Sequence, residues 1–360
     1  VFVFGGRSGR LGDARQYLSS VEYLDPTLLE WRRGPDMKFA RVGLAAAFLA
    51  GSYYVIGGYN QLNGGEAQRS VERLDVATMQ WSACAPLLVP RYGHSACACD
   101  GKIYVMGGDH AGVLIPFAER YDPLTDSWER LPDMPIRVAA SRAVTIDEKI
   151  YVFGGCDPSV PGDRASDAIL MFDPVVGGWT SLSKRMTTGR TAFALAHLQD
   201  GVVIAGGFDL TSRPELEMSS VERLSLSNSE TDLSLPALPI PRAGCQGVAL
   251  SELPFGSAFP MVVLGGEFVD PTTGVCRVFD TASMMTAPTT SRRNSFVNNL
   301  KEYLVKKIVS QTGWSDSILP PMQFKRTAFA ACMGTVWPKG YGYHDAPRGS
   351  LSWWMMRRSG

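Results

Sequence analysis

Short apolar runs that end in a pair of glycines recur along the chain. In the run Lys102–Met106, every residue after the first is apolar, as expected of an inner strand buried on both faces. A period near 50 residues predicts six copies of one structural unit. The pairs are Gly5-Gly6, Gly57-Gly58, Gly107-Gly108, Gly154-Gly155, Gly206-Gly207 and Gly265-Gly266, spaced by 52, 50, 47, 52 and 59 residues.

Three other residue types keep the same period. An arginine precedes the glycine pair at Arg41, Arg91, Arg137, Arg190 and Arg242. An aspartate ends a later strand of the unit at Asp25, Asp75, Asp122, Asp173 and Asp280, with Ser225 in the fifth unit. A tryptophan follows the aspartate by six positions at Trp31, Trp81, Trp128 and Trp179.

Each unit is predicted to be a four-stranded antiparallel sheet. Asp100-Gly101 precedes an apolar run and suits the positive φ values of a two-residue hairpin turn. The tryptophan is expected to fill space between adjacent sheets. One such sheet cannot bury both of its faces, whereas six sheets stacked around an axis can. The sequence therefore predicts an all-β, six-bladed propeller.

The two ends of the chain predict how the ring closes. Residues 1–6 begin at a second strand, and Arg326–Ala330 repeats the five letters of Arg190–Ala194. We expect residues 324–334 to supply the missing first strand and to pair with residues 1–6, which hides both sheet edges. The propeller then spans residues 1–336, with a non-repeat insertion at 281–313 and an irregular tail at 337–360.

Composition narrows the class of protein. Lys plus Arg equals Asp plus Glu at 35 each, and 45% of residues are hydrophobic. No global field therefore attracts nucleic acid or an anionic membrane, and the chain is not of the disordered type. The seven cysteines include no CxxC pair, so we expect neither a disulfide framework nor a zinc site, and a cytoplasmic location. The chain opens without methionine, and we expect sequence to be missing before residue 1.

Four segments resemble the kelch repeats of BTB-kelch proteins. They are Ser70–Asp75 (SVERLD), Ala118–Pro123 (AERYDP), Pro90–Ser95 (PRYGHS) and Trp128–Met134 (WERLPDM). In that family the propeller captures a substrate protein, and a BTB module recruits a cullin-type ubiquitin ligase. The resemblance implies a protein-interaction module that acts as a substrate adaptor if a BTB module lies upstream. Other kelch proteins are scaffolds or bind actin, which is the alternative.

Two units depart from the pattern. The fifth has Ser225 and Thr231 in place of the aspartate and the tryptophan, and the sixth carries the insertion before Trp314. Within the insertion, residues 295–311 have apolar residues at four-residue spacing among basic ones, which predicts a basic amphipathic helix. A partner-docking helix, a solvated excursion and a mistaken gene model are the alternatives.

The resemblance places partners on the loops between second and third strands and between blades. The residues after the glycine pairs are predicted to be loop tips, and serines five positions before the aspartate are predicted to lie near the channel mouth. The candidate binding residues are Arg7, Arg10, Ser20, Tyr59, Asn60, Arg69, Ser70, Asp109, His110, Arg164, Phe208, Arg213, Ser220 and Glu267. The repeated arginines are interpreted as structural, because a task shared by every blade is not a specific binding site.

Small residues stand two positions after the arginines, at Gly43, Gly93, Ala139, Ala192, Gly244 and Ala328. An acidic peptide is therefore not the default ligand. An oxidase of the galactose-oxidase type needs converging His and Tyr ligands, and of the four histidines only His110 is expected on the binding face. No phosphate loop or nucleophile elbow is present. We expect no enzyme activity, no metal and no cofactor.

Overall fold

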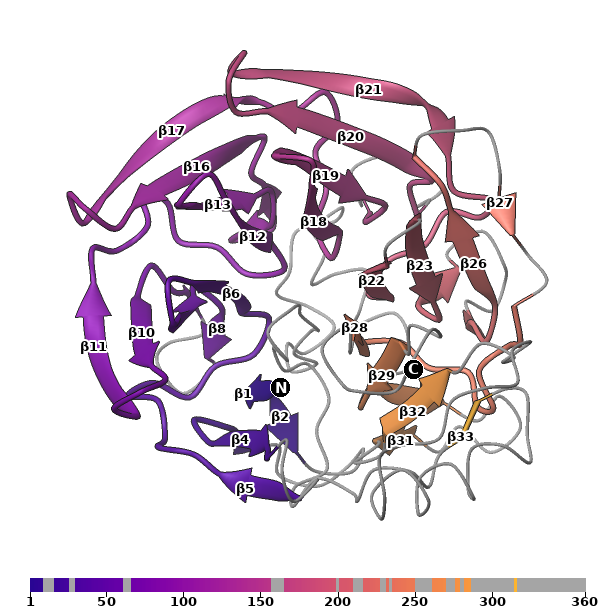
Figure 1. Ribbon diagram of the computed structural model, residues 1–360, viewed down its shortest axis with the longest axis horizontal. Coiled ribbons are helices and arrows are strands. Elements are labelled where there is room, and N and C mark those ends of the chain that lie inside the picture. The colour runs from indigo at the N-terminus through magenta and orange to yellow at the C-terminus, as the bar shows by residue number, and fades with distance from the viewer. Residues whose placement is uncertain are drawn as a thin grey trace, which may run out of the picture.

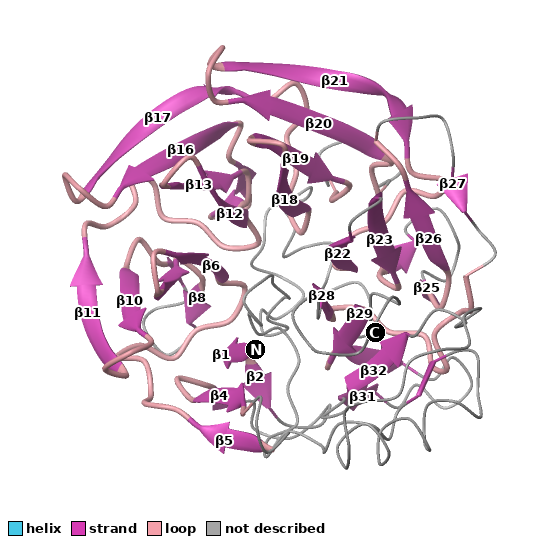
Figure 2. Cartoon of the chain, viewed as in Figure 1, coloured by secondary structure: helices cyan, strands magenta, loops and turns pink. Residues whose placement is uncertain are grey.

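The computed structural model describes residues 1–8, 16–25, 30–60, 66–156, 165–198, 201–209, 216–226, 231–232, 235–249, 261–269, 276–278, 282–285 and 314–315. Within these residues the fold consists of antiparallel sheets arranged around a central axis, as Figure 1 shows in a view down that axis. Figure 2 shows strands and loops and no helix in the described part of the chain.

Five of the sheets are complete blades with four strands each. Blade 2 contains β6 (Ala45–Leu49), β7 (Ser52–Ile56), β10 (Val71–Asp75) and β11 (Gln80–Cys84). Blade 3 contains β12 (Ser95–Cys99), β13 (Lys102–Met106), β16 (Phe117–Asp122) and β17 (Ser127–Asp133). Blade 4 contains β18 (Arg142–Ile146), β19 (Lys149–Phe153), β20 (Ala168–Asp173) and β21 (Gly178–Arg185). Blade 5 contains β22 (Ala194–Leu198), β23 (Gly201–Ala205), β26 (Val221–Leu224) and β27 (Thr231–Asp232). The fifth complete sheet contains β28 (Gln246–Ala249), β29 (Met261–Leu264), β32 (Ala282–Met285) and β33 (Trp314–Ser315).

The N-terminal sheet has three strands, β1 (Phe2–Phe4), β4 (Val21–Leu24) and β5 (Trp31–Arg33). The prediction of six four-stranded blades is therefore corrected to five complete blades and this three-stranded sheet. The strand predicted to close the ring, residues 324–334, lies outside the described residues, as does the tail 337–360. Closure by that strand stays a prediction.

The pairing register between third and fourth strands explains the repeated tryptophan position. Trp81 lies opposite Leu74 and Trp128 opposite Tyr121. Thr231 opposes Leu224 and Trp314 opposes Met285 in the same way, so Thr231 occupies the tryptophan position of blade 5. The indole N–H of each tryptophan donates to a carbonyl oxygen in the segment that precedes its own blade. Trp81 donates to Pro35 O at 2.9 Å, Trp128 to Ala85 O at 2.9 Å and Trp179 to Pro132 O at 3.1 Å. The tryptophans thus join neighbouring blades.

The last blade departs from the sequence prediction. Its third strand is β32, which pairs with β29, although these residues were assigned to the insertion 281–313. The predicted third strand instead supplies β31 (Cys276–Val278), which pairs with β30 (Glu267–Val269) in a two-stranded ribbon. The ribbon lengthens the link between second and third strands and displaces the third strand beyond Asp280. The rest of the insertion lies outside the described residues.

A belt of backbone hydrogen bonds joins the blades near the axis. Each belt residue after the first donates its N–H to the carbonyl of its equivalent in the preceding blade, at 2.7–3.0 Å. All five members have φ between 53° and 65°, where small residues are least strained. The members are Gly43, Gly93, Ala140, Ala192 and Gly244. Sequence analysis listed Ala139 as the small residue equivalent to Gly43 and Gly93, and the structure corrects this to Ala140.

Candidate interaction face

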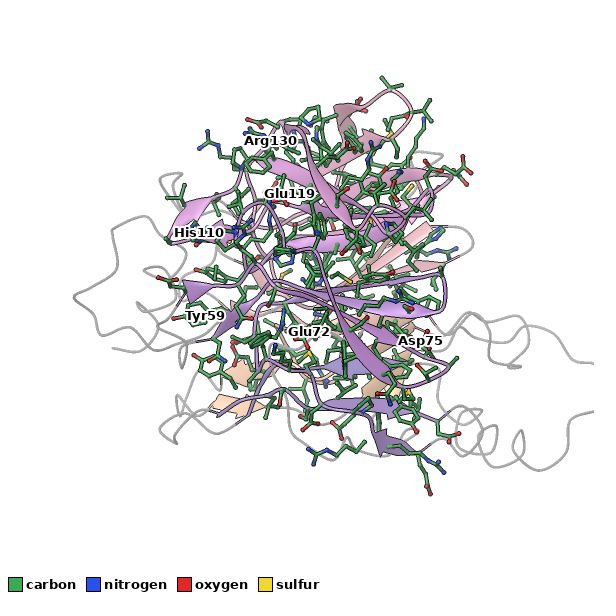
Figure 3. All side chains as sticks on the ribbon, turned by 90° about the vertical axis from the view of Figure 1, so that its left-hand side faces the viewer. Tyr59, Glu72, Asp75, His110, Glu119 and Arg130 are labelled. Atoms are coloured by element: carbon green, nitrogen blue, oxygen red, sulfur yellow. The ribbon has the colours of Figure 1, made fainter. Side chains whose placement is uncertain are left out.

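The links between second and third strands and the links between blades emerge at one end of the molecule, here called the loop face. Figure 3 shows Tyr59 and His110 toward this end and Asp75, the last residue of the third strand of blade 2, toward the opposite end. Four blades carry short ribbons on the loop face besides β30–β31: β2 (Arg7–Ser8) with β3 (Gln16–Tyr17), β8 (Tyr59–Asn60) with β9 (Glu66–Ala67), β14 (Asp109–His110) with β15 (Val113–Leu114), and β24 (Phe208–Asp209) with β25 (Leu216–Glu217).

The residues that follow the last five glycine pairs are buried, which corrects their prediction as loop tips. Each of these five bridges the inter-blade link of its own blade, as Tyr59 does with Val42 and Asp109 with Tyr92. The bridge folds the first residue of the loop under the ribbon. Tyr59, Asn60, Asp109, Phe208 and Glu267 are all exposed by 7% or less.

These buried residues form an apolar layer beneath the loop face. The ring of Tyr59 lies between those of Tyr17 and Tyr92, with ring centroids 6.3 Å from Tyr17 and 5.5 Å from Tyr92. Leu114, Cys156 and Phe208 continue the layer in later blades. The layer supports the ribbons from below, and contact of these residues with a partner stays a prediction.

Asp109 and His110 are two adjacent polar residues of this layer. Burial raises the pKa of the Asp109 carboxyl, against the lowering effect of a hydrogen bond from the Gly112 N–H at 2.8 Å. His110 is half-buried, and its Nδ1 has no hydrogen-bond partner among the described residues. Asp109 is fully buried, so its carboxyl is not open to a ligand on the loop face.

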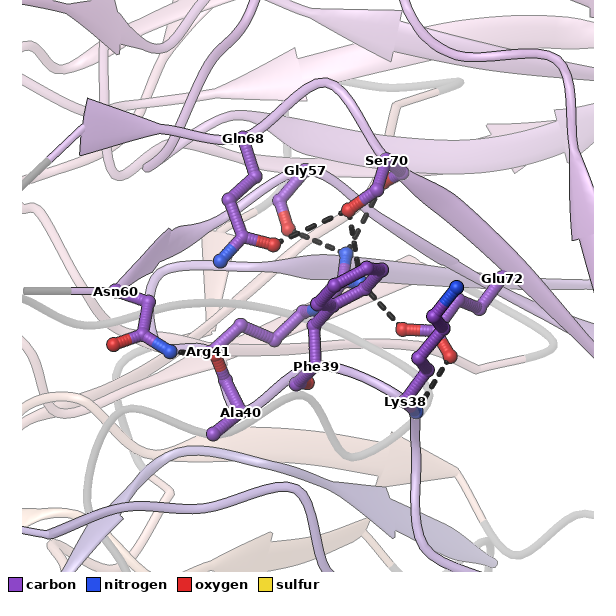
Figure 4. A network of polar contacts seen from close by, with 9 residues as sticks. All are labelled: Lys38, Phe39, Ala40, Arg41, Gly57, Asn60, Gln68, Ser70 and Glu72. Atoms are coloured by element: carbon purple, nitrogen blue, oxygen red, sulfur yellow. Dashed lines mark hydrogen bonds and ion pairs between the residues drawn. The ribbon is translucent and has the colours of Figure 1, made fainter. Parts of the chain in front are cut away.

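The repeated arginines serve the scaffold. Arg41 is fully buried, donates to Gly57 O at 2.8 Å and pairs with Glu72 at 2.5 Å, as Figure 4 shows. The other Glu72 oxygen accepts the N–H of Lys38 at 2.7 Å. Burial lowers the pKa of the Arg41 guanidinium, which Glu72 partly offsets. We call this buried arginine–glutamate ion pair the clasp; it recurs as Arg91 with Glu119 and as Arg190 with Glu222.

The serines predicted at the channel mouth belong to the first and third of these clasps or to the core. Ser70 Oγ accepts from Arg41 Nη2 at 3.0 Å, and Ser220 Oγ accepts from Arg190 Nη2 at 3.3 Å. Ser20 is only 8% exposed. In blade 3 the position is Phe117, whose ring lies under the Arg91 and Arg130 guanidinium groups at 5.5 and 4.0 Å. The position therefore completes the arginine environment.

Blade 4 lacks the clasp altogether. The carbonyl oxygen of Val138, not that of Arg137, accepts the N–H of Gly108, as the carbonyl oxygen of Arg91 accepts the N–H of Gly58. Val138 is therefore the equivalent residue, and Arg137 is exposed. Leu170 occupies the glutamate position and packs with Val138 in one apolar cluster. The residue equivalent to Lys38 is Pro135, which has no N–H to satisfy. Three coordinated changes thus convert a buried ion pair into an apolar contact.

Exposed side chains of the inter-blade links and ribbons form the surface of the loop face. Lys38, Arg69 and Arg137 are exposed and form no ion pair within the described residues. Leu88 is 43% exposed and Val113 is 64% exposed. Of these five, sequence analysis identified only Arg69. Arg7 lies in β2 with no described side chain, and Arg10, Arg164 and Arg213 lie outside the described residues.

The exposed link residues stand on a fixed backbone. The N–H groups of Lys38, Leu88 and Thr187 donate to the buried glutamates at 2.7–2.9 Å. Arg69 Nε donates to Leu87 O at 2.7 Å. The sequence signal that could have found Lys38, Leu88 and Thr187 is position: each directly follows a buried residue, namely Met37, Leu87 and Met186.

His94 gives the scaffold a pH dependence. It is fully buried at the position of Leu44 and Phe193 in other blades, and burial, with the charges of Arg91 and Arg41 adding to it, holds the pKa of its imidazole well below 6.5. The unfolded chain therefore binds a proton first as pH falls below about 6.5, and folding stability drops.

We expect wild-type stability to fall about 1.4 kcal/mol more per pH unit than that of His94→Leu, in the range from pH 6.5 down to the folded-state pKa. Urea unfolding of both proteins at pH 7.5, 6.5 and 5.5 measures this difference. A constant difference across the three pH values would show that His94 is not buried in its neutral form.

Two further observations concern metal binding and membrane spans in the residues that the structure describes. No group of three or more His, Cys, Asp and Glu residues there is arranged to hold a metal ion. The same residues include no helix with the length and hydropathy needed to cross a membrane.

Comparison with known proteins identifies the repeats. The KLHDC2/KLHL20/DRC7 Kelch-repeats domain matches residues 1–155, and the Kelch motif matches residues 137–186. Kelch domain-containing protein 8B of Rattus norvegicus is 29% identical over 44% of this chain and 43% of its own length. The human Kelch repeat and BTB domain-containing protein 12 is 29% identical over 34% of this chain and 20% of its own length. The matches thus span less than half of these relatives.

A solved structure shares the fold. The structure of YjhT matches 75% of this chain and 89% of its own chain, with a TM-score of 0.60 and 17% identity. At this identity the match supports the propeller architecture alone.

Proposed function

We propose that this chain, a β-propeller of kelch repeats, is a protein-interaction module that captures a protein or peptide partner on its loop face. One observation carries the proposal: exposed cationic and apolar side chains stand on links whose backbone N–H groups are held by buried glutamates. A backbone that is fixed before binding loses little entropy when a partner docks. Arginine is also enriched among the residues that dominate interface energies.

The finer proposal is that the partner is a substrate protein and that the chain serves a cullin-type ubiquitin ligase. The resemblance to BTB-kelch proteins supports it, together with the relative whose name joins kelch repeats and a BTB domain. A free-standing scaffold, or a propeller that binds actin filaments, is the second candidate. The first candidate recruits a cullin-type ligase in addition to the loop-face partner, and the second does not.

Charge reversal tests the loop face. The variant Arg69→Glu/Leu88→Asp/Arg137→Glu changes three exposed side chains, so its thermal unfolding is expected to match the wild type within a few degrees. Partner capture from a lysate, quantified by mass spectrometry, is expected to drop at least tenfold. Arg32→Glu, a charge reversal on the exposed outer strand β5, is the control and is expected to retain capture.

Two further measurements separate the candidates. Recovery of a cullin with the captured protein supports the ligase adaptor, whereas co-sedimentation with actin filaments supports the second candidate. Equal capture by wild type and the triple variant would remove the loop face from the proposal.

A further inference from the structure

Blades 3 and 4 expose large apolar side chains at the links between their third and fourth strands. Leu124 is 94% exposed, Val175 is 92% exposed and Val176 is 78% exposed. The equivalent turn of blade 2 carries Val76, which is half-buried, and Ala77. Side chains this exposed contribute little to the folded core, so stability does not explain their apolar character.

The turns hold these side chains outward. Asp122 Oδ1 accepts the N–H of Leu124 at 2.9 Å, and Asp173 Oδ1 accepts the N–H of Val175 at 2.9 Å. Such Asx turns fix the backbone two residues beyond the aspartate. The tips are thus presented by rigid turns on the end of the molecule opposite the loop face.

Ion pairs join each turn to the inner hairpin of its own blade, and a hydrogen bond joins the two inner hairpins. Within blade 3, Lys102 of the inner hairpin pairs with Asp122 at 2.5 Å; within blade 4, Lys149 pairs with Asp173 at 3.4 Å. Between the blades, Thr145 Oγ1 donates to Ala98 O at 2.7 Å. We call this surface, made by the hairpins and turns of blades 3 and 4, the turn patch.

The turn patch is acidic. Its two lysines are neutralised by the aspartates of the turns. Asp100, Asp147 and Glu148, at the tips of the inner hairpins, are exposed and form no ion pair within the described part of the chain. Cys99 Sγ lies 3.3 Å from Glu148 O, which places the two hairpin tips side by side. The unpaired carboxylates therefore stand on the same two hairpins to which the apolar turns are joined by ion pairs.

We propose that the turn patch binds a basic amphipathic segment of a partner protein. Apolar side chains of the segment would cover Leu124, Val175 and Val176, and its lysines or arginines would face the three carboxylates. Charge complementarity decides the occupant, because an anionic membrane or a nucleic acid would be repelled by the same carboxylates. This surface is separate from the loop face, so the two sites can be occupied together.

The test uses the full chain and a fluorescent 14-residue peptide of leucine and lysine at helical spacing. Anisotropy titration at low salt is expected to show saturable binding. Leu124→Ser/Val175→Ser/Val176→Ser is expected to weaken binding at least tenfold, and Asp100→Asn/Asp147→Asn/Glu148→Gln is expected to do the same and to remove most of its salt dependence. A glutamate version of the peptide and the Arg69→Glu protein are the controls for non-specific attraction.

Each outcome decides the proposal. Unchanged affinity in either triple variant, with unfolding transitions like the wild type, overturns it. Binding of the protein to anionic vesicles through the turn patch would assign the patch to a membrane. Sedimentation that shows a dimer lost in the serine variant, without a change in peptide affinity, would assign it to a second copy of the chain.

Discussion

Replacing Glu119 by leucine is expected to destabilise the protein by about 3–5 kcal/mol, as removal of one partner of a buried ion pair does. Glu119 and Arg91 are both fully buried and paired. Without the carboxylate, the guanidinium remains in the core with its hydrogen bond to Gly107 O, and the N–H of Leu88 loses its acceptor. Urea unfolding monitored by tryptophan fluorescence measures the loss.

Blade 4 shows how to recover that stability. The same positions there hold Val138, Leu170 and Pro135, so an apolar version of the clasp already folds in this chain. Arg91→Val/Glu119→Leu is expected to regain most of the loss, and addition of Leu88→Pro removes the orphaned N–H as well. Buried ion pairs replaced by apolar residues of similar volume are often close to neutral. A double variant as unstable as Glu119→Leu would contradict this account.

The strands and their stacking were predictable because they follow from the period. Every blade must end its second strand with the same bend, and all twelve glycines of the pairs have positive φ. The tryptophan position was predictable for a similar reason, since one indole is needed at each of these junctions between blades. Features that every blade shares leave a signal that repeats, and six repeats make it strong.

Errors arose where residue identity and structural position differ. Arg137 was assigned as the repeated arginine of its unit because of its residue type, although Val138 stands the usual 16 residues before the glycine pair. The third strand of the last blade was misplaced because the β30–β31 ribbon contains a plausible strand ahead of Asp280. In both cases the backbone pairing decides, and a single sequence does not record it.

The interaction residues were hardest to predict. Tyr59 and Asp109 follow a strand and precede a polar loop, which is typical of an exposed tip. Their burial depends on bridges to Val42 and Tyr92, seventeen residues earlier in each case. The exposed Leu88 and Val113 are apolar and resemble core residues in the sequence. Local polarity therefore gave the wrong answer wherever a loop folds back on its own blade.

Two glycines of blade 3 allow the cost of a left-handed backbone to be measured separately from the cost of a steric overlap with an added Cβ. Gly107 and Gly101 have nearly the same φ, 61° and 66°. A Cβ at Gly107 would lie 2.3 Å from Val138 O, whereas a Cβ at Gly101 would meet nothing within 4 Å. The carbonyl of Val138 cannot retreat freely, because it accepts the N–H of Gly108 at 3.0 Å and so joins blades 3 and 4.

Gly101→Ala is therefore expected to cost only the left-handed conformation, about 1–2 kcal/mol. Blade 4 places Glu148 at the equivalent hairpin position with φ of 60°, which shows that a side chain is tolerated there. Gly107→Ala adds a backbone overlap and is expected to cost about 3 kcal/mol or more in total. Urea unfolding of both variants at pH 7.5 measures the two costs. If the two alanines destabilise equally, strain alone governs the glycine pair and the contact with Val138 does not matter.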